Sequence, residues 1–229
     1  MESFQRKLWS ENHKKLSNCI LNPNLHNSAV ELFLNLHVQL YSSQMTNSQL
    51  ITLEDELLHD ISEETLRTYP VKTPGTINSI VWHLWHAARI EDMTMNILVH
   101  NDDQIFSSGD WFNQLKVDCA HSGNGMTEEE IGVLSTKIDI DALLAYRLEV
   151  GRKTREIISS LQPGQFKQPV NLARLQKLME QGAVKQEESW LTEYWGKKTI
   201  AGLMLMPATR HNFVHLNKAI RIKQKYQKR

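Results

Sequence analysis

Glycine and proline are scarce in this sequence, which has only 10 glycines and 6 prolines among 229 residues. Because these residue types interrupt helices and mark turns, their scarcity predicts long helices with few breaks. A chain of this length suits one domain with a sizeable core. We therefore expect a single domain over residues 1–229.

Cysteine and long apolar runs are also rare. The two cysteines, Cys19 and Cys119, lie far apart and form no CxxC motif, which excludes a disulfide framework and predicts a reducing compartment. No apolar run approaches the ~20 residues of a membrane span, and we find no apolar signal-peptide core near the amino terminus. We expect a cytoplasmic protein without a membrane partner.

Neither sign of charge is in excess, because 26 basic residues balance 26 acidic ones. Binding to nucleic acid through a bulk basic field is therefore not expected. The remaining classes are an enzyme or binding protein for a small molecule, and a protein-interaction module.

Four long segments have the periodicity of amphipathic or buried helices. They are residues 27–46, 76–99, 139–161 and 199–225. The second is apolar on nearly every side, which indicates a central helix. Pro207 lies inside the last segment and predicts a kink or a restart there. With no convincing strands, the pattern predicts an all-α four-helix bundle.

The connections between these segments contain shorter helical patterns. Residues 53–66 predict a short polar helix, and Thr127 with Glu130 forms a capping-box pattern. Residues 165–198 predict a helical insertion before the last bundle helix. We expect these pieces to pack over the bundle as extra short helices.

Two pairs of histidines lie in the most apolar parts of the sequence. His83 and His86 are in the second long segment, and His211 and His215 are four residues apart in the last one. Side chains at that spacing share a helix face, so both rings can reach one metal ion. Buried imidazoles need partners, and a shared metal would supply one to several rings at once. The alternative is that each ring bonds to a carbonyl. Periodicity does not choose between His83 and His86.

Other polar residues lie on the apolar faces of these helices. His37 could be a fourth ligand, a partner of a ligand or a proton carrier. The alternative is a core histidine held by hydrogen bonds. Glu91 or Asp92 could orient a ligating imidazole. The alternative for these carboxylates is an ion pair with a basic residue such as Arg89.

The stretches "SIVWHLWHAARIEDMTMN" and "LMPATRHNFVHLN" resemble a bacterial branch of the DinB-like superfamily, and the resemblance extends from about residue 27 to residue 224. It implies a four-helix bundle with up-down-down-up topology that is often a homodimer. It also implies a divalent metal site in which "WHAAR" supplies His86 and "RHNFVH" supplies His211 and His215. His83 would then be an extra imidazole beside that site.

The resemblance further implies a reaction. Relatives include metal-dependent transferases that use bacillithiol or a similar low-molecular-weight thiol, and a mycothiol-dependent maleylpyruvate isomerase. We therefore expect a divalent metal, with zinc first and nickel or iron as alternatives, and a thiol cosubstrate. The expected function is a metal-dependent thiol S-transferase or a related hydrolase or isomerase acting on a small molecule.

Three neutral imidazoles would leave a coordination position open, as in catalytic zinc sites. A thiol bound there would lose its proton near neutral pH, and His83 or His37 would serve as the catalytic residue that moves it. Trp82, Trp85 and Met93 could line a pocket for an electrophile or simply belong to the core. The competing hypothesis is a binding or structural protein of the same fold, without turnover.

Overall fold

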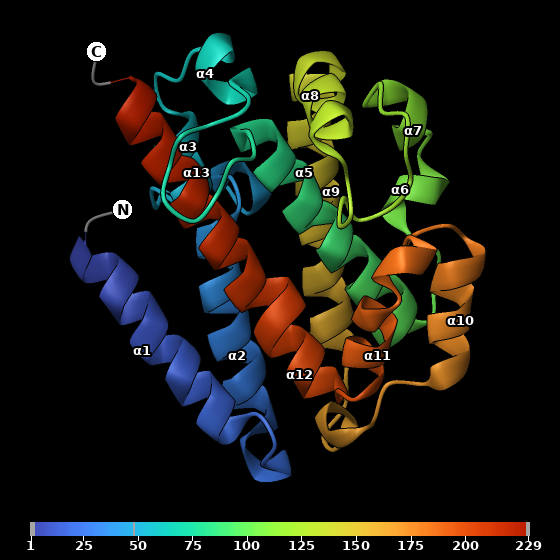
Figure 1. Cartoon of the computed structure of the whole chain (residues 1–229). Coiled ribbons are helices and arrows are strands. Elements are labelled where there is room, and N and C mark those ends of the chain that lie inside the picture. The colour runs from blue at the N-terminus through green and yellow to red at the C-terminus, as the bar shows by residue number, and fades with distance from the viewer. Residues whose placement is uncertain (1–2, 48, 228–229) are drawn as a thin grey trace.

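The computed structural model describes residues 3–47 and 49–227, and Figure 1 shows an all-helical fold. Within these ranges no strand forms, and only two isolated bridges occur, Thr73 with Thr76 and Pro169 with Thr199. No helix in the described ranges combines the length and apolar character needed to cross a bilayer. The predicted all-α class is confirmed.

Four long helices form the bundle. They are α2 (His26–His37), α5 (Ile80–Asp92), α9 (Ile140–Ser160) and α13 (Asn212–Tyr226). In Figure 1 the chain ascends along α2, descends along α5 and α9, and ascends again along α13. This is the up-down-down-up order that the sequence resemblance implied.

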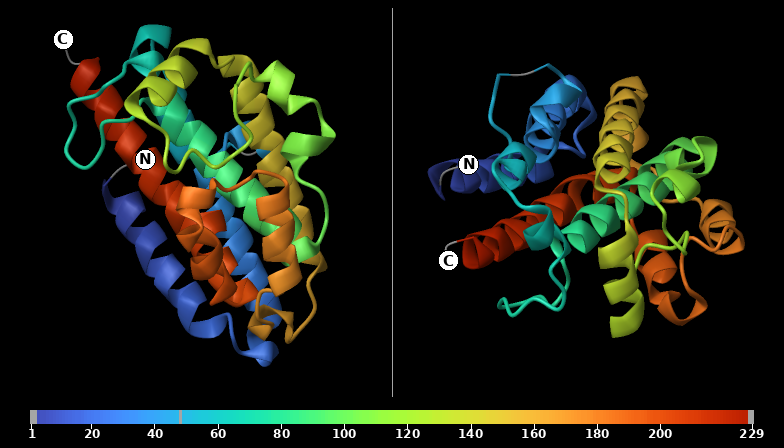
Figure 2. Two further views of the ribbon diagram at one scale, coloured as in Figure 1. Left: turned by 45° about the vertical axis from the view of Figure 1, so that its right-hand side comes forward. Right: turned by 90° about the horizontal axis from the view of Figure 1, so that it is seen from above.

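The centre of the bundle is α5, which lies between α9 and α13 in both figures (Figures 1 and 2). Every residue of α5 is buried, as the nearly uniform apolar pattern predicts. Ser79 caps its start by accepting a hydrogen bond from the Trp82 amide at 3.1 Å. The helix continues as a wider π-helical segment, Met93–His100. The helix predicted over 76–99 therefore ends close to its predicted end, but it begins later than predicted, at Ile80.

The last bundle helix is built in three pieces. They are α12 (Ile200–Leu205), a π-helical segment (Met206–His211) and α13. Pro207 lies at the start of the π-helical segment, so the predicted interruption is confirmed. Beside this break, the Thr209 hydroxyl donates to the Leu205 carbonyl at 3.0 Å, and His13 Nε2 lies 2.9 Å from the same carbonyl.

Two predicted boundaries are wrong. The first long helix ends at His37 instead of residue 46, because Tyr41 turns inward beside Gly151 of α9, where a Cβ would lie 2.9 Å from the Tyr41 ring. The predicted helix 53–66 is two helices, α3 (Leu53–Leu58) and α4 (Glu63–Arg67), because Thr52 and Ser62 each cap a separate start.

An additional helix, α1 (Ser3–Cys19), packs along α2 (Figure 1). Trp9 anchors it: its indole Nε1 donates to the Leu36 carbonyl at 3.0 Å, and its ring stacks on Phe213 with centroids 4.0 Å apart. The polar sequence of this segment gave no signal for that packing.

Short helices fill the connections. They are α6 (Ile105–Ser108), α7 (Trp111–Gln114), α8 (Glu128–Lys137), α10 (Leu172–Glu180) and α11 (Trp190–Gly196). The capping box of Thr127 and Glu130 at the start of α8 is confirmed. Residues 165–198 contain α10 and α11, which lie against the lower part of the bundle in Figure 1. This packing places α11 next to His86 and His211 of the bundle.

Candidate metal centre

Three histidines from the two central helices meet in the bundle. His86 comes from α5, His211 ends the π-helical segment and His215 lies one turn later in α13; one ring nitrogen from each lies within 4.8 Å of the others. His86 Nε2 and His211 Nε2 are 3.2 Å apart. Two imidazole nitrogens bound to a tetrahedral ion at 2.0–2.1 Å would be roughly 3.4 Å apart. This histidine triad therefore fits a divalent metal.

The orientation of His86 is fixed by a backbone carbonyl. Its Nδ1 donates to the Ser122 carbonyl at 2.5 Å, and Trp82 stacks on its ring with centroids 4.6 Å apart. A carbonyl only accepts, so Nδ1 carries the hydrogen and Nε2 presents a lone pair to the other two rings. Sequence reasoning missed Ser122, because its contribution comes from the main chain and has no side-chain signature.

The loop that carries this carbonyl needs glycine at position 123. Gly123 has φ +86°, and a Cβ there would lie 2.6 Å from Cζ3 of Trp85. The Ser122 amide also donates to the Ala183 carbonyl at 3.1 Å, so the segment between α10 and α11 holds the loop in place. Residues 165–198 thus support the triad indirectly.

We expect Gly123→Ala to weaken metal binding at least tenfold, because the loop must withdraw from Trp85 and the His86–Ser122 bond is lost. Gly75→Ala is the matched control: Gly75 has φ +80° but nothing lies within 4 Å of a Cβ there. Competition titration with a chelating indicator measures both affinities. Equal affinities in the two variants would contradict the role of this loop.

His83 lies beside the triad and contacts His215. Its Nδ1 is 2.9 Å from His215 Nδ1, and its Nε2 is 2.9 Å from Thr76 Oγ1. When His215 donates from Nδ1 and His83 donates from Nε2 to the threonine, His215 Nε2 keeps a lone pair for a cation. The structure places His83 as a partner of a triad member, and its catalytic role stays a prediction.

His37 does not reach the triad. Its side chain is fully buried, and its Nε2 lies 2.8 Å from Oε1 of Glu91. Tyr41 donates to Glu91 Oε2 at 2.7 Å, and Asn212 Nδ2 donates to the same oxygen. This geometry matches the alternative of a hydrogen-bonded core histidine, so a proton-carrying role for His37 also stays a prediction.

The two acidic residues of α5 serve other partners. Asp92 accepts from Arg89 at 3.1 Å and from the Tyr146 hydroxyl at 2.6 Å, and both Asp92 and Arg89 are fully buried. Within the described part of the chain, neither Asp92 nor Glu91 accepts a hydrogen bond from the triad. Of the two roles considered for Asp92, the structure shows the ion pair with Arg89 and not the orientation of a ligating imidazole.

Burial keeps the clustered imidazoles neutral. Loss of solvent lowers the pKa of His86 to about 4, although its bond to the Ser122 carbonyl acts in the opposite direction. Burial likewise lowers the pKa of His83 to about 3 and holds the pKa values of His211 and His215 well below the usual value. Neutral rings are the form that binds metal.

The metal-free protein should lose stability as the pH falls. The unfolded chain binds a proton at His86 near pH 6.5, whereas the folded chain does so only near pH 4, so acid favours unfolding between these values. From this shift alone we expect the unfolding free energy to be on the order of 2 kcal/mol lower at pH 5 than at pH 7.5. Urea titrations with chelator present measure it. His86→Gln should make the dependence less steep, because His83, His211 and His215 still contribute to it; an unchanged slope would contradict this assignment.

A cavity of about 190 Å³, here called the triad pocket, opens beside His86 and His211. Its other lining residues are Ile90, Asn124, Trp190, Leu191, Tyr194, Trp195, Met206 and Pro207. A ligand in this pocket would lie directly against two of the three histidines. Trp82, Trp85 and Met93 are buried and do not line it, so the alternative of plain core residues holds for them.

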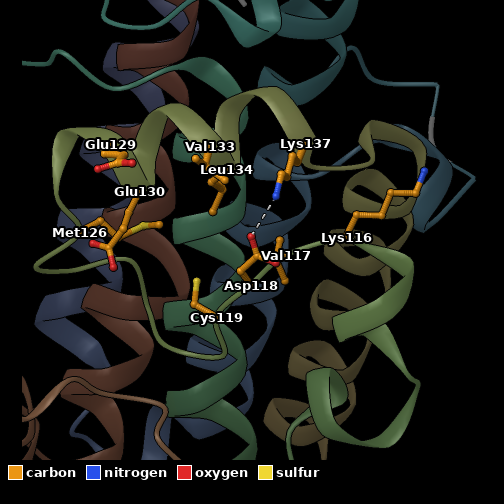
Figure 3. A pocket seen from close by; sticks show the side chains of 10 residues that line it. All are labelled: Lys116, Val117, Asp118, Cys119, Met126, Glu129, Glu130, Val133, Leu134 and Lys137. Atoms are coloured by element: carbon orange, nitrogen blue, oxygen red, sulfur yellow. Dashed lines mark hydrogen bonds and ion pairs between the residues drawn. The ribbon is translucent and has the colours of Figure 1, made fainter.

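A second cavity, of about 210 Å³, lies beneath α8 and shares no lining residue with the triad pocket (Figure 3). Cys119 lines it, and burial raises the pKa of this thiol to about 11. The thiol therefore stays protonated and weakly nucleophilic near pH 7. Cys19 and Cys119 are free cysteines, and neither lines the triad pocket.

Comparisons with known proteins agree with this architecture. The crystal structure of a conserved protein from Enterococcus faecalis is similar to this chain, with a TM-score of 0.60, 14% identity, and coverage of 87% of this chain and 97% of that chain. No curated protein matches the sequence. The model of the DinB superfamily matches residues 51–217, a range that contains all three histidines of the triad. The chain therefore belongs to the DinB superfamily.

Proposed function

We propose that the protein is a metal-dependent enzyme that transfers a low-molecular-weight thiol to a small electrophile. The observation that carries this proposal is the convergence of ring nitrogens from His86, His211 and His215 beside a cavity that a ligand can enter. Three imidazoles suit zinc first, with nickel and iron as alternatives. Three protein ligands leave room for a substrate atom, which is typical of catalytic sites.

A divalent cation held by the triad would lower the pKa of a thiol bound to it, which makes the sulfur a nucleophile near pH 7. The protein contributes the position of the three imidazoles and the protonation state of their rings. Ser122 fixes the tautomer of His86, and a hydrogen bond donated by His215 Nδ1 to His83 would leave Nε2 of His215 available to the cation. Thr76 is partly exposed and bonds to His83 Nε2, so this pair offers a route for a proton toward solvent.

The test combines metal content with turnover. Untagged protein is assayed by elemental analysis and then with 1-chloro-2,4-dinitrobenzene and bacillithiol, glutathione or coenzyme A. In this reaction a C–S bond forms, the C–Cl bond breaks, and the thiol proton goes to solvent. Turnover with one thiol that stops on chelation and returns with metal supports the proposal. Stoichiometric metal without turnover of any thiol would contradict it.

A second candidate function is a non-catalytic metal staple, which the position of the triad across α5 and α13 favours. Removal of the metal from a staple should lower the unfolding free energy by several kcal/mol, with no thiol consumption. An enzyme with an open coordination position should consume thiol. His83→Ala separates the roles further: metal should stay bound, whereas thiol turnover should fall if His83 moves the proton.

A further inference from the structure

The wall of the triad pocket opposite the bundle comes from α11, which contributes Trp190, Leu191, Tyr194 and Trp195. We propose that the triad pocket binds a small, neutral, single-ring apolar group of the substrate, and that Trp190 and Tyr194 determine this preference. The proposal rests on the proposed function and adds the chemical class of the electrophile.

The charge of the lining argues for a neutral group. None of the residues that line the triad pocket is an aspartate, glutamate, lysine or arginine. An ionised group placed there would lose its water without gaining a partner of opposite charge among the lining residues. Ionic substrates should therefore be disfavoured.

The size of the pocket limits the group to about one ring. Its volume is about 190 Å³, whereas an apolar cavity of about 150 Å³ in another protein holds benzene. A benzene ring with one short substituent fills such a space, and a fused polycyclic group exceeds it. A low-molecular-weight thiol would have to extend outward from the pocket, leaving the space beside α11 to the electrophile.

The aromatic side chains of α11 favour a flat ligand. Trp190 and Tyr194 line the pocket and are 51% and 37% exposed, so ring surface is available for stacking, on Tyr194 at the face that Lys198 does not cover. Both are held in place: Trp190 Nε1 donates to Glu188 Oε2 at 2.6 Å, and Lys198 Nζ lies 4.2 Å from the centre of the Tyr194 ring.

The wall is anchored rather than loosely attached. Trp195 is only 2% exposed, and at Gly196 a Cβ would lie 2.9 Å from Leu175 of α10, which shows how closely the two helices approach.

A polar group also lines the triad pocket: Asn124, whose Oδ1 accepts a hydrogen bond from the Ser122 hydroxyl at 2.9 Å. Its amide hydrogens are then the groups that it can offer to an oxygen substituent of the ligand.

The test uses three probes of one shape and different charge on the full-length protein with chelator present: benzyl alcohol, benzoate and benzylammonium. We expect benzyl alcohol to bind at least tenfold more tightly than either ion, by ligand-observed NMR. Trp190→Ala and Tyr194→Ala should each weaken it at least fivefold. Phe112→Ala is the control, because Phe112 is also an exposed aromatic residue, at 42%, but lies on α7 outside the pocket.

One further variant tests charge without disturbing the core. Tyr194→Glu should reverse the preference toward benzylammonium. Equal binding of the three probes, or unchanged binding in both α11 alanine variants, would overturn the inference. Metal content is measured on the same preparations before chelation, so the two proposals fail separately. Stoichiometric metal without the probe preference refutes this inference alone, and the preference without metal refutes the proposed function alone.

Discussion

His211→Ala should reduce the metal content of the purified protein from about one ion per chain to less than a tenth of that value. The ring of His211 lies close to both other rings, with its Nε2 3.2 Å from His86 Nε2 and its centroid 4.3 Å from that of His215. Its removal leaves two imidazoles of the triad, and among the described residues no carboxylate belongs to the cluster and could replace the lost ligand. Two-ligand sites bind divalent metals weakly, so dialysis should empty the site. Elemental analysis after dialysis measures the effect.

The matched control for this variant is His59→Ala. His59 is an exposed histidine beside Asp60, with 77% of its side chain accessible, and its replacement should leave metal content unchanged. Circular dichroism of both variants verifies that the helices are retained. Metal content at the wild-type level in folded His211→Ala would show that the triad is not the metal site.

Glu91→Ala should lower the unfolding free energy by about 3–5 kcal/mol. Glu91 is completely buried and accepts hydrogen bonds from His37 and Tyr41, at and just after the end of α2, and from Asn212, at the start of α13. Without the carboxylate these three donors remain buried and lose their acceptor, which costs free energy for each of them. Urea unfolding of the variant and the wild type at pH 7.5 measures the difference.

Glu63→Ala is the control for charge removal. Glu63 pairs with Arg67 at 2.7 Å, but its side chain is 70% exposed, so its loss should change the unfolding free energy by less than about 1 kcal/mol. Similar losses in the two variants would refute the assignment of Glu91 as the hub of a buried network. Glu91→Gln should lie between them, because an amide keeps one acceptor oxygen.

The long helices and several of their interruptions follow from local sequence. The apolar pattern of α5 predicted the most buried helix, Pro207 predicted the break before α13, and the TxxE pattern predicted the start of α8. Local sequence did not predict where α2 ends, and it did not predict α1 at all. Both features depend on single side chains that pack across the bundle. Tyr41 reaches α9, and Trp9 reaches Phe213 of α13.

The candidate site divides in the same way. The sequence by itself determined that His211 and His215 share a helix face and that a second pair lies in the central helix, because helical spacing is a local property. Periodicity left open whether His83 or His86 joins these two; the family resemblance implied His86, and the tertiary structure brings His86 to them. Only the tertiary structure decided that His83 bonds to His215 and that His37 pairs with Glu91. The physical reason is that helical spacing does not fix the rotation of one helix against another, and packing across the bundle does.

The surroundings of the site depend even more on tertiary structure. The Ser122 carbonyl that orients His86 is a main-chain group that every residue type carries, so no sequence pattern marks it. The wall formed by α11 lies about a hundred residues along the chain from His86, and only the packing of α10 and α11 onto the bundle brings the two together. Local periodicity determined which residues are buried, and the folded chain decided which of them meet.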